Sequence, residues 1–195
     1  MNEYVLLTHS RSSVEGGLEV FSRNLKNIFP SLLILGKEDV LSKKENGLVS
    51  LIAKEPQLAS ELANLVEKKF PSPKAIFANG LYACAIDKEK CQTHIVTFLH
   101  GTYSGLAEKA YSKSDLIYWR MKWIYSFFEK KSAHNASIVI SNSFHTQREA
   151  LKEYGVNSHV VELPINTTIF NPGNKKTSRK KLEIHSEKKM ILFDG

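Results

Sequence analysis

The chain has 195 residues, of which 42% are hydrophobic and 24% are charged, a size and composition that fit one complete domain with part of another. Its net charge of +7 at pH 7 favours anionic partners such as phosphates, anionic lipid surfaces or nucleic acid. The two cysteines, Cys84 and Cys91, have neither a second pair nor a histidine cluster beside them, which excludes a zinc site built on them.

We expect the N-terminus to carry no export signal. MNEYVLLTHS has an acidic residue where a signal peptide has basic ones, and its apolar run ends at Thr8. No stretch approaches the roughly 20 apolar residues of a membrane-spanning helix. We therefore expect a cytoplasmic protein, and any membrane contact is expected to be peripheral, on the inner face.

Short apolar runs alternate with amphipathic segments along most of the chain. In chain order we expect a strand at 4–8, a helix at 18–28, strands at 31–35 and 47–53, a helix at 57–69, strands at 75–78 and 95–99, a helix at 114–133, a strand at 137–140, a helix at 144–154 and a strand at 160–163. Parallel neighbours need crossover connections, so this order predicts an α/β fold with a Rossmann-like, doubly wound parallel sheet.

The composition changes after Pro172. Residues 173–188 are polar and strongly basic, as in a linker, and a short helix is expected to run to Ile184. Residues 189–193 are an apolar run that predicts another strand. We therefore expect an N-terminal domain at 1–172, a linker at 173–188 and the first strand of a further domain at 189–195.

A glycine-containing loop at 9–17 precedes the first helix. Gly16 and Gly17 let the backbone approach a ligand, and the helix N-terminus offers unpaired N–H groups to a phosphate. The loop lacks the Gly-Lys-Ser/Thr ending of a P-loop and the three-glycine fingerprint of dinucleotide-binding folds. A Gly-Gly pair before a helix is as often a tight turn, so both interpretations stay open.

His100 follows the buried strand expected at 95–99. Ligands of open α/β sheets collect at the carboxyl ends of strands, where a neutral imidazole donates a hydrogen bond to a sugar hydroxyl or a phosphate oxygen. A purely structural, hydrogen-bonded histidine is the alternative. The other histidines show no metal-ligand spacing. No spacing pairs two carboxylates across a cleft, and the candidates for acid–base work are Glu15, Glu19, Asp115, Glu129 and Glu149.

The segment 111–131 is rich in aromatic and basic residues. Trp119, Arg120, Lys122 and Trp123 have the composition of an interfacial helix that contacts anionic lipid. Its aromatic residues surround the helix without forming one stripe, and a helix that is apolar on most sides is more often buried against its own sheet. Lipid contact and core packing therefore both stay open. Lysines and arginines are otherwise scattered without a recognition motif, so we expect no nucleic-acid binding.

Five stretches occur in an order known from one family: GGLEVFSRNL at 16–25, VTFLHG at 96–101, NASIVISNSFHTQREALKEYGV at 135–156, LPINTTIFNP at 163–172 and KKMILFDG at 188–195. In this order the chain resembles the N-terminal part of glycosyltransferase family 4, within the GT-B superfamily. The last stretch is similar to the opening strand of that family's second domain. Pro164 and Asn166 depart from the family, which has Gly and Asp in this hinge loop, and Asp194 stands where the family has an apolar residue.

The resemblance implies a retaining transferase that moves a sugar from a nucleoside-diphosphate sugar to an acceptor, without a cofactor or metal, across a cleft between two Rossmann-like domains. It implies that Gly16 and Gly17 contact the donor diphosphate or the acceptor, that Glu19 supports this loop and that His100 is the catalytic-site residue facing the transferred sugar.

The family's donor-binding residues belong to the second domain. We therefore expect this chain to be the acceptor-binding domain of a hexosyltransferase-like enzyme and to transfer no sugar by itself, since positioning and charge neutralisation supply most of such catalysis. The sequence identifies neither the acceptor nor the oligomeric state. The alternative function is a non-catalytic module that binds a phosphorylated ligand or an anionic membrane surface.

Overall fold

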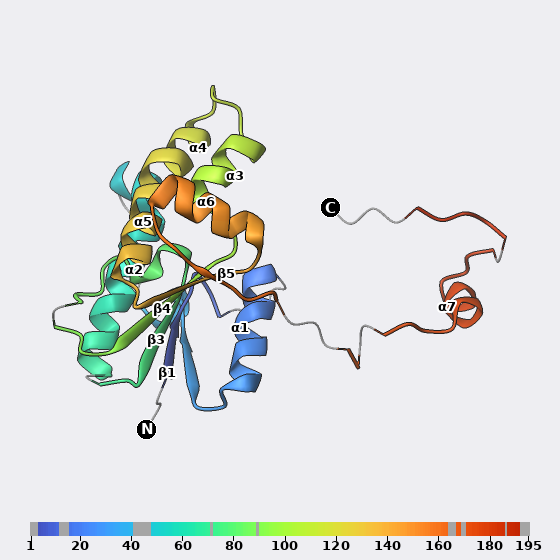
Figure 1. Ribbon diagram of the computed structural model, residues 1–195, viewed down its shortest axis with the longest axis horizontal. Helices are drawn as coiled ribbons and strands as arrows, with labels where there is room; N and C mark the ends of the chain where they lie inside the picture. Colours follow the sequence, from blue (N-terminus) through green and yellow to red (C-terminus); the bar gives the residue numbers. More distant parts are fainter. Residues whose placement is uncertain are drawn as a thin grey trace. The chain divides into compact units, whose positions relative to one another are not determined.

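The computed structural model describes residues 4–11, 16–40, 48–70, 72–88, 90–163, 167–168, 171–185 and 187–191 (Figure 1). The chain divides into two compact units, Met1–Leu163 and Pro164–Gly195. The first unit ends at Leu163, and the predicted domain boundary at residue 172 stays a prediction.

The first unit is built on a parallel sheet. Its described strands have the order β2-β1-β3-β4-β5-β6, and every neighbouring pair in this sheet is parallel. The strands are β1 (Tyr4–Leu7), β2 (Leu32–Leu35), β3 (Ala75–Asn79), β4 (His94–Leu99), β5 (Ile138–Ser141) and β6 (His159–Val160). The predicted Rossmann-like α/β fold is therefore confirmed.

Helices connect these strands. The α-helices are α1 (Gly17–Ile28), α2 (Leu48–Lys69), α3 (Tyr103–Ala110), α4 (Leu116–Trp119), α5 (Ser126–Asn135), α6 (Phe144–Tyr154) and α7 (Lys175–Lys181). Two short 3₁₀ helices, η1 (Lys37–Asp39) and η2 (Gly80–Ala83), follow β2 and β3. A π-helix, η3 (Arg120–Tyr125), joins α4 to α5.

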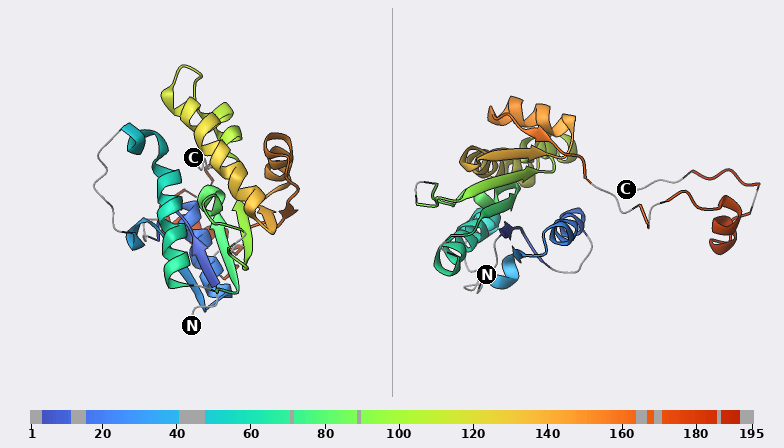
Figure 2. Two further views of the ribbon diagram at one scale, coloured as in Figure 1. Left: turned by 90° about the vertical axis from the view of Figure 1, so that its left-hand side faces the viewer. Right: turned by 60° about the horizontal axis from the view of Figure 1, so that its bottom comes forward.

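Helices cover both faces of the sheet, because successive strand residues point to opposite sides. On one face α1 packs on a cluster that contains Leu6, Leu25, Leu32, Phe77, Val96 and Phe98. On the other face α2, α5 and η2 pack on a cluster that contains Val5, Leu7, Leu58, Leu62, Val66, Ile76 and Ile95. Figure 1 shows α1 on one side of the strands and α2 and α5 on the other, and the left view of Figure 2 shows α2 and α5 in front of the sheet.

The strand predicted at 47–53 is wrong, because Leu48 already begins α2; Gly47 lies outside the described residues. The helix has one non-helical residue, Ala53 (φ −122°, ψ 29°), and continues through Pro56. Proline is tolerated there because it stands in the first turn after the interruption, where its missing N–H has no helical partner. A short apolar run such as Leu48–Ile52 fits a buried strand and a helix equally well, and continuity with the helix that follows decides between them.

Three further elements differ from the prediction. The single helix expected at 114–133 is α4, η3 and α5 in succession, and α3 was not predicted. The last strand is only the two residues of β6, at one edge of the sheet. Four residues singled out in the sequence lie outside the described residues: Glu15, Pro164, Asn166 and Asp194.

The second unit contains α7, within the segment predicted as a linker with a short helix. The Asn174 side chain caps this helix by accepting hydrogen bonds from the N–H groups of Lys176 and Thr177, at 3.0 and 3.2 Å. Residues 189–191 have no strand assignment and 192–195 are outside the described residues. The further domain expected from 189 onwards therefore stays a prediction.

Candidate functional site

A cavity of about 560 Å³ opens at the carboxyl edge of the sheet. The residues that line it come from the ends of β1, β3 and β4 and from α1, α2, η2, α3, η3 and α5: His9, Leu18, Glu19, Glu55, Asn79, Gly80, Tyr82, His100, Gly101, Thr102, Tyr103, Leu106, Arg120, Met121, Tyr125 and Glu129. The carboxyl ends of parallel strands meet at one edge of a sheet, which is where α/β folds bind ligands. His100 lies in this cavity as the sequence predicts.

His100 is held by Asn79, the last residue of β3. Its Nε2 lies 3.3 Å from Asn79 Oδ1, and the Asn79 amide donates to the buried Thr8 hydroxyl at 3.1 Å. The ring packs edge-on against Phe21 of α1, with 4.6 Å between ring centroids. Burial lowers the pKa of His100 to about 4. The imidazole is therefore neutral at pH 7.

The bond to Asn79 also fixes the tautomer of His100. A carbonyl oxygen only accepts, so Nε2 carries the proton and Nδ1 keeps a lone pair. No residue in the described part of the chain donates to Nδ1. In this tautomer Nδ1 is able to accept a hydrogen bond from a ligand hydroxyl. Donation from His100 to a sugar hydroxyl or a phosphate oxygen stays a prediction.

A second histidine shares the cavity. His9, which follows β1, lies 3.0 Å from Glu55 Oε2 of α2, and the Tyr82 hydroxyl donates to the same carboxylate. The hydrogen bond to Glu55 raises the pKa of His9 against the opposing effect of burial. Burial works to raise the pKa of Glu55 as well, but the hydrogen bonds from His9 and Tyr82 lower it overall. His9 and Glu55 thus place an imidazole with a raised pKa in the cavity, and the Glu55 carboxylate holds this ring in position.

Sequence reasoning missed this group. His9 stands directly after β1 as His100 stands directly after β4, so the rule that selected His100 applies to it equally. Glu55 carries no such signal, because it lies within helix α2 and its contact with His9, 46 residues earlier in the chain, is not encoded by spacing.

Glu129 lines the far side of the cavity and is buried, with 3% of its surface exposed. Its Oε2 accepts from the Tyr103 N–H at 2.8 Å and from the Tyr154 hydroxyl. Burial raises the pKa of Glu129 to about 7, although both hydrogen bonds act to lower it. Of the five acidic candidates, Glu19 and Glu129 line the cavity, whereas Asp115 and Glu149 do not.

The π-helix η3, within segment 111–131, contributes three residues to the cavity. Arg120, Met121 and Tyr125 line it, and the Arg120 guanidinium lies over the Tyr125 ring, 5.5 Å from its centroid. Arg120, a candidate for membrane contact in the sequence, lines the cavity, and its contact with lipid stays a prediction. A π-helix shifts the angular position of every residue after it, and such segments are frequent at functional sites.

The other residues of that segment divide by exposure. Tyr118 and Tyr125 are buried, as core packing requires. Trp119 and Trp123 are 47% and 65% exposed. Lys122 is tied to Glu108 and Glu153, with Nζ–Oε distances of 3.0 and 3.5 Å. Core packing thus holds for Tyr118 and Tyr125, and lipid contact by the exposed side of this segment stays a prediction.

The glycine pair begins α1 as predicted, with Gly16 as the N-cap residue and Gly17 as the first helical residue. Neither glycine lines the large cavity, whereas Leu18 and Glu19 do. The Glu19 carboxylate folds back into the space that a side chain at Gly16 would occupy. Glycine at this position therefore allows Glu19 to adopt its observed position.

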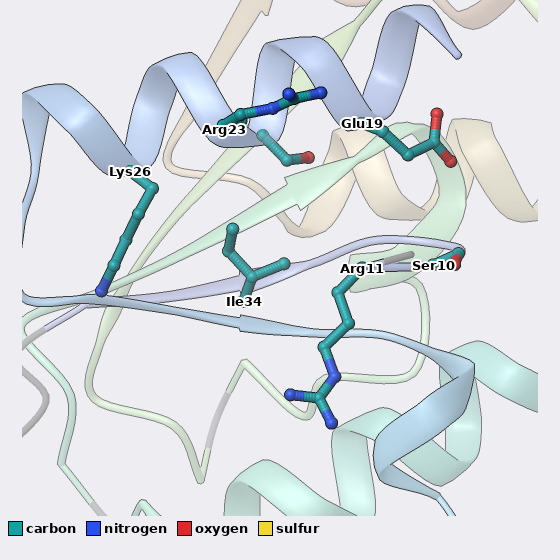
Figure 3. Close-up of a pocket in the computed structure, with 7 residues that line it drawn as sticks. Ser10, Arg11, Glu19, Arg23, Lys26 and Ile34 are labelled. Carbon is teal, nitrogen blue, oxygen red and sulfur yellow. The ribbon is translucent and has the colours of Figure 1, made fainter. Parts of the chain in front are cut away.

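Glu19 also borders a second cavity, of about 300 Å³, between α1 and β2. Arg23 and Lys26 of α1 line it, and Arg11 lies across from α1, beside the strands (Figure 3). Arg11 Nε is paired with Asp39 at 3.2 Å, and Lys26 Nζ donates to the Pro30 carbonyl at 2.7 Å. These two cations are already bound to oxygens of the protein.

No group of three or more His, Cys, Asp or Glu side chains among the described residues is arranged to hold a metal ion. Within the same residues, no helix combines the length and the apolar character needed to cross a membrane.

Comparison with known proteins gives similarity at the level of structure. No protein-family model matches the chain, and no curated protein matches it. Among solved structures, the chain is similar to a UDP-glucosyltransferase from Polygonum tinctorium capable of glucosylating indoxyl, in complex with 3,4-dichloroaniline. The sequences are 13% identical, the match covers 92% of this chain and 55% of that chain, and the TM-score is 0.41. This chain thus spans about half the length of that structure, and the comparisons establish no family for it.

Proposed function

We propose that this chain is the acceptor-side domain of a retaining glycosyltransferase, and that the large cavity holds the hydroxyl-bearing part of the acceptor. The observation that carries the proposal is the state of His100. This ring is neutral, fixed by Asn79 and left with an acceptor nitrogen at the carboxyl edge of the sheet. A hydroxyl group is the ligand group that donates to such a nitrogen.

The charges around the cavity favour a hydroxyl-bearing ligand over a phosphorylated one. Three carboxyl groups line it, those of Glu19, Glu55 and Glu129, against one guanidinium, that of Arg120, and the His9 ring. A phosphate in this cavity would be repelled by the carboxylates of Glu19 and Glu55. Hydroxyl groups, in contrast, both donate to carboxylates and accept from protonated groups.

The donor half of the reaction is assigned by resemblance to family 4. A nucleoside-diphosphate sugar bound to a further domain would present its transferred sugar across the cleft, with His100 facing that sugar and the loop at Gly16 and Gly17 near the diphosphate. This chain contributes the binding and orientation of the acceptor hydroxyl. Sugar transfer by the 195-residue chain alone would contradict this division of roles.

Replacing His100 by alanine is expected to weaken the binding of methyl β-glucoside by about tenfold, because one hydrogen bond and part of the cavity wall are lost. The measurement is an amide NMR titration, in which Gly80, Gly101 and Thr102 are expected to shift in the unmodified protein. His94→Ala is the matched control, since His94 is exposed at the opposite end of the same strand. Equal affinities of the two variants, or shifts confined to residues away from the cavity, would refute the proposal.

A second function is favoured by the exposed side of the α4–η3–α5 segment. Leu116, Trp119, Trp123 and Phe127 form what we call the tryptophan face, with exposed fractions of 84%, 47%, 65% and 62%. Lys130 and Lys131 are exposed on α5, and Lys113 is exposed just before α4. Exposed aromatic side chains beside lysines suit a surface of anionic lipid. We propose that this face attaches the domain to such a surface.

Replacing Trp119 and Trp123 together by serine is expected to reduce sedimentation with phosphatidylglycerol vesicles by at least tenfold, since burying each large side chain contributes about 1.5–3 kcal/mol. Phe144→Ser, which removes an aromatic side chain that is 63% exposed on α6, is expected to have no effect. Equal sedimentation with phosphatidylcholine vesicles, or no change in the double variant, would exclude membrane attachment through this face.

A further inference from the structure

The two oxygens of Glu129 have different surroundings. Oε2 accepts both hydrogen bonds that the structure gives this side chain, from the Tyr103 N–H and the Tyr154 hydroxyl. No donor from the described part of the chain reaches Oε1. A carboxyl group that is 3% exposed thus keeps one oxygen without a protein partner, although buried polar atoms are normally satisfied.

Gly80 opens the path from this oxygen to the cavity. A Cβ atom at position 80 would stand 3.1 Å from Glu129 Oε1, and both residues line the cavity. Gly80 also has a positive φ of 53°, which side chains disfavour. With no side chain at this position, Oε1 is left accessible to a ligand in the cavity.

The hydrogen bonds to Oε2 decide which oxygen carries a proton. A backbone N–H only donates, and together with the Tyr154 hydroxyl it occupies the lone pairs of Oε2. When Glu129 is neutral, its O–H group is therefore on Oε1. Burial, which raises the pKa of this carboxyl to about 7, keeps much of it in that form at neutral pH.

We propose that Glu129 is a specificity-determining residue of the cavity, whose Oε1 hydroxyl donates a hydrogen bond to a hydroxyl oxygen of a neutral saccharide acceptor. The inference rests on the proposed function. It narrows the acceptor from an unspecified molecule to a saccharide that carries no charge where it contacts Glu129. His100 and Glu129 then hold the saccharide from two sides, one as an acceptor and the other as a donor. A phosphorylated sugar is disfavoured because Glu19 and Glu55 line the same cavity.

The test measures the affinity for methyl β-glucoside from pH 6 to pH 8, with glucose 6-phosphate as the anionic probe. In the unmodified protein the affinity for the glucoside is expected to fall by about tenfold as Glu129 loses its proton, and glucose 6-phosphate is expected to bind more weakly throughout. Glu129→Gln keeps an acceptor for Tyr103 and Tyr154 and points an N–H donor at the cavity. This variant is expected to bind the glucoside at pH 8 as tightly as at pH 6.

Other titratable groups surround Glu129: Tyr103 on α3, Tyr154 and Glu149 on α6, and His9, Glu55, His100 and Arg120 around the cavity. They are present in both proteins, so the difference between the two pH profiles isolates Glu129. Glu129→Met removes the hydrogen bond and is expected to weaken glucoside binding at pH 6 by about tenfold. Glu67→Gln, on the exposed side of α2, is the control and is expected to behave as the unmodified protein.

The outcomes separate this inference from the proposed function. Binding that depends on His100 but has the same pH profile in the unmodified protein and in Glu129→Gln would overturn the role of Glu129 and leave the proposed function standing. Tighter binding of glucose 6-phosphate than of the glucoside would overturn the neutral saccharide. Absence of glucoside binding, or binding independent of His100, would overturn both.

Discussion

Glu129→Gln is expected to raise the free energy of unfolding at pH 8 by about 2–3 kcal/mol and to leave it nearly unchanged near pH 4.5. The pKa of Glu129 is raised in the folded protein from an ordinary value of 4.5 to about 7. Between these two values the folded protein keeps a proton that the unfolded chain has released. The stability that this proton contributes is fully present below pH 4.5, decreases as pH rises and is lost above pH 7. Glutamine stays neutral and avoids this loss.

Urea denaturation at pH 4.5, 6 and 8 measures this effect in the unmodified protein, in Glu129→Gln and in the surface control Glu67→Gln. The pKa of His9 is also raised, so the loss of its proton as pH rises lowers the free energy of unfolding as well. This effect is the same in all three proteins. Only the difference between profiles is therefore assigned to Glu129. Parallel profiles for the unmodified protein and Glu129→Gln would show that this carboxyl is not held neutral by burial.

Much of the sheet can be predicted from sequence because its strands are short, buried and separated by recognisable helices. Residues 4–8, 75–78, 95–99 and 137–140 were expected to be strands and correspond to β1, β3, β4 and β5 within a residue or two. The failure at 47–53 has a different origin. An apolar run of this length has no periodicity that separates strand from helix, and neither the interruption at Ala53 nor the role of Pro56 is visible without the backbone.

The sequence predicts a site residue only where its position at the end of a strand or the start of a helix is enough to place it at the edge of the sheet. His100 follows a strand, and Glu19 stands in the first turn of α1, so the parallel sheet brings both to one edge. Arg120 is a membrane-contact candidate by composition alone, and composition does not indicate that this residue also lines the cavity. Glu129 was a candidate for acid–base work, but its partner residues, at 103 and 154, come from two other helices, and no spacing in the sequence encodes that contact.

Asn79→Leu is expected to lower the free energy of unfolding by about 2–4 kcal/mol. Asn79 is 2% exposed and holds two partners, the Thr8 hydroxyl at 3.1 Å and His100 Nε2 at 3.3 Å. Leucine has similar volume but neither donates nor accepts, so both partners lose their bonds in a place that water does not readily reach. Urea denaturation measures the change, and Asn27→Leu, at an exposed position on α1, is expected to lie within about 0.5 kcal/mol of the unmodified protein.

The double variant Thr8→Val, Asn79→Leu tests why Asn79→Leu loses stability. It shows whether the loss comes from buried polar groups that are left without a hydrogen-bond partner. Replacing both partners of a buried hydrogen bond by apolar groups is far less costly than removing one, so adding Thr8→Val is expected to recover about 1 kcal/mol of the stability that Asn79→Leu loses. Binding of methyl β-glucoside is not expected to recover with it, because His100 still lacks the partner that fixes its proton on Nε2. Recovery of binding together with stability would mean that Asn79 supports only the sheet, and that His100 is oriented by its contact with Phe21 instead.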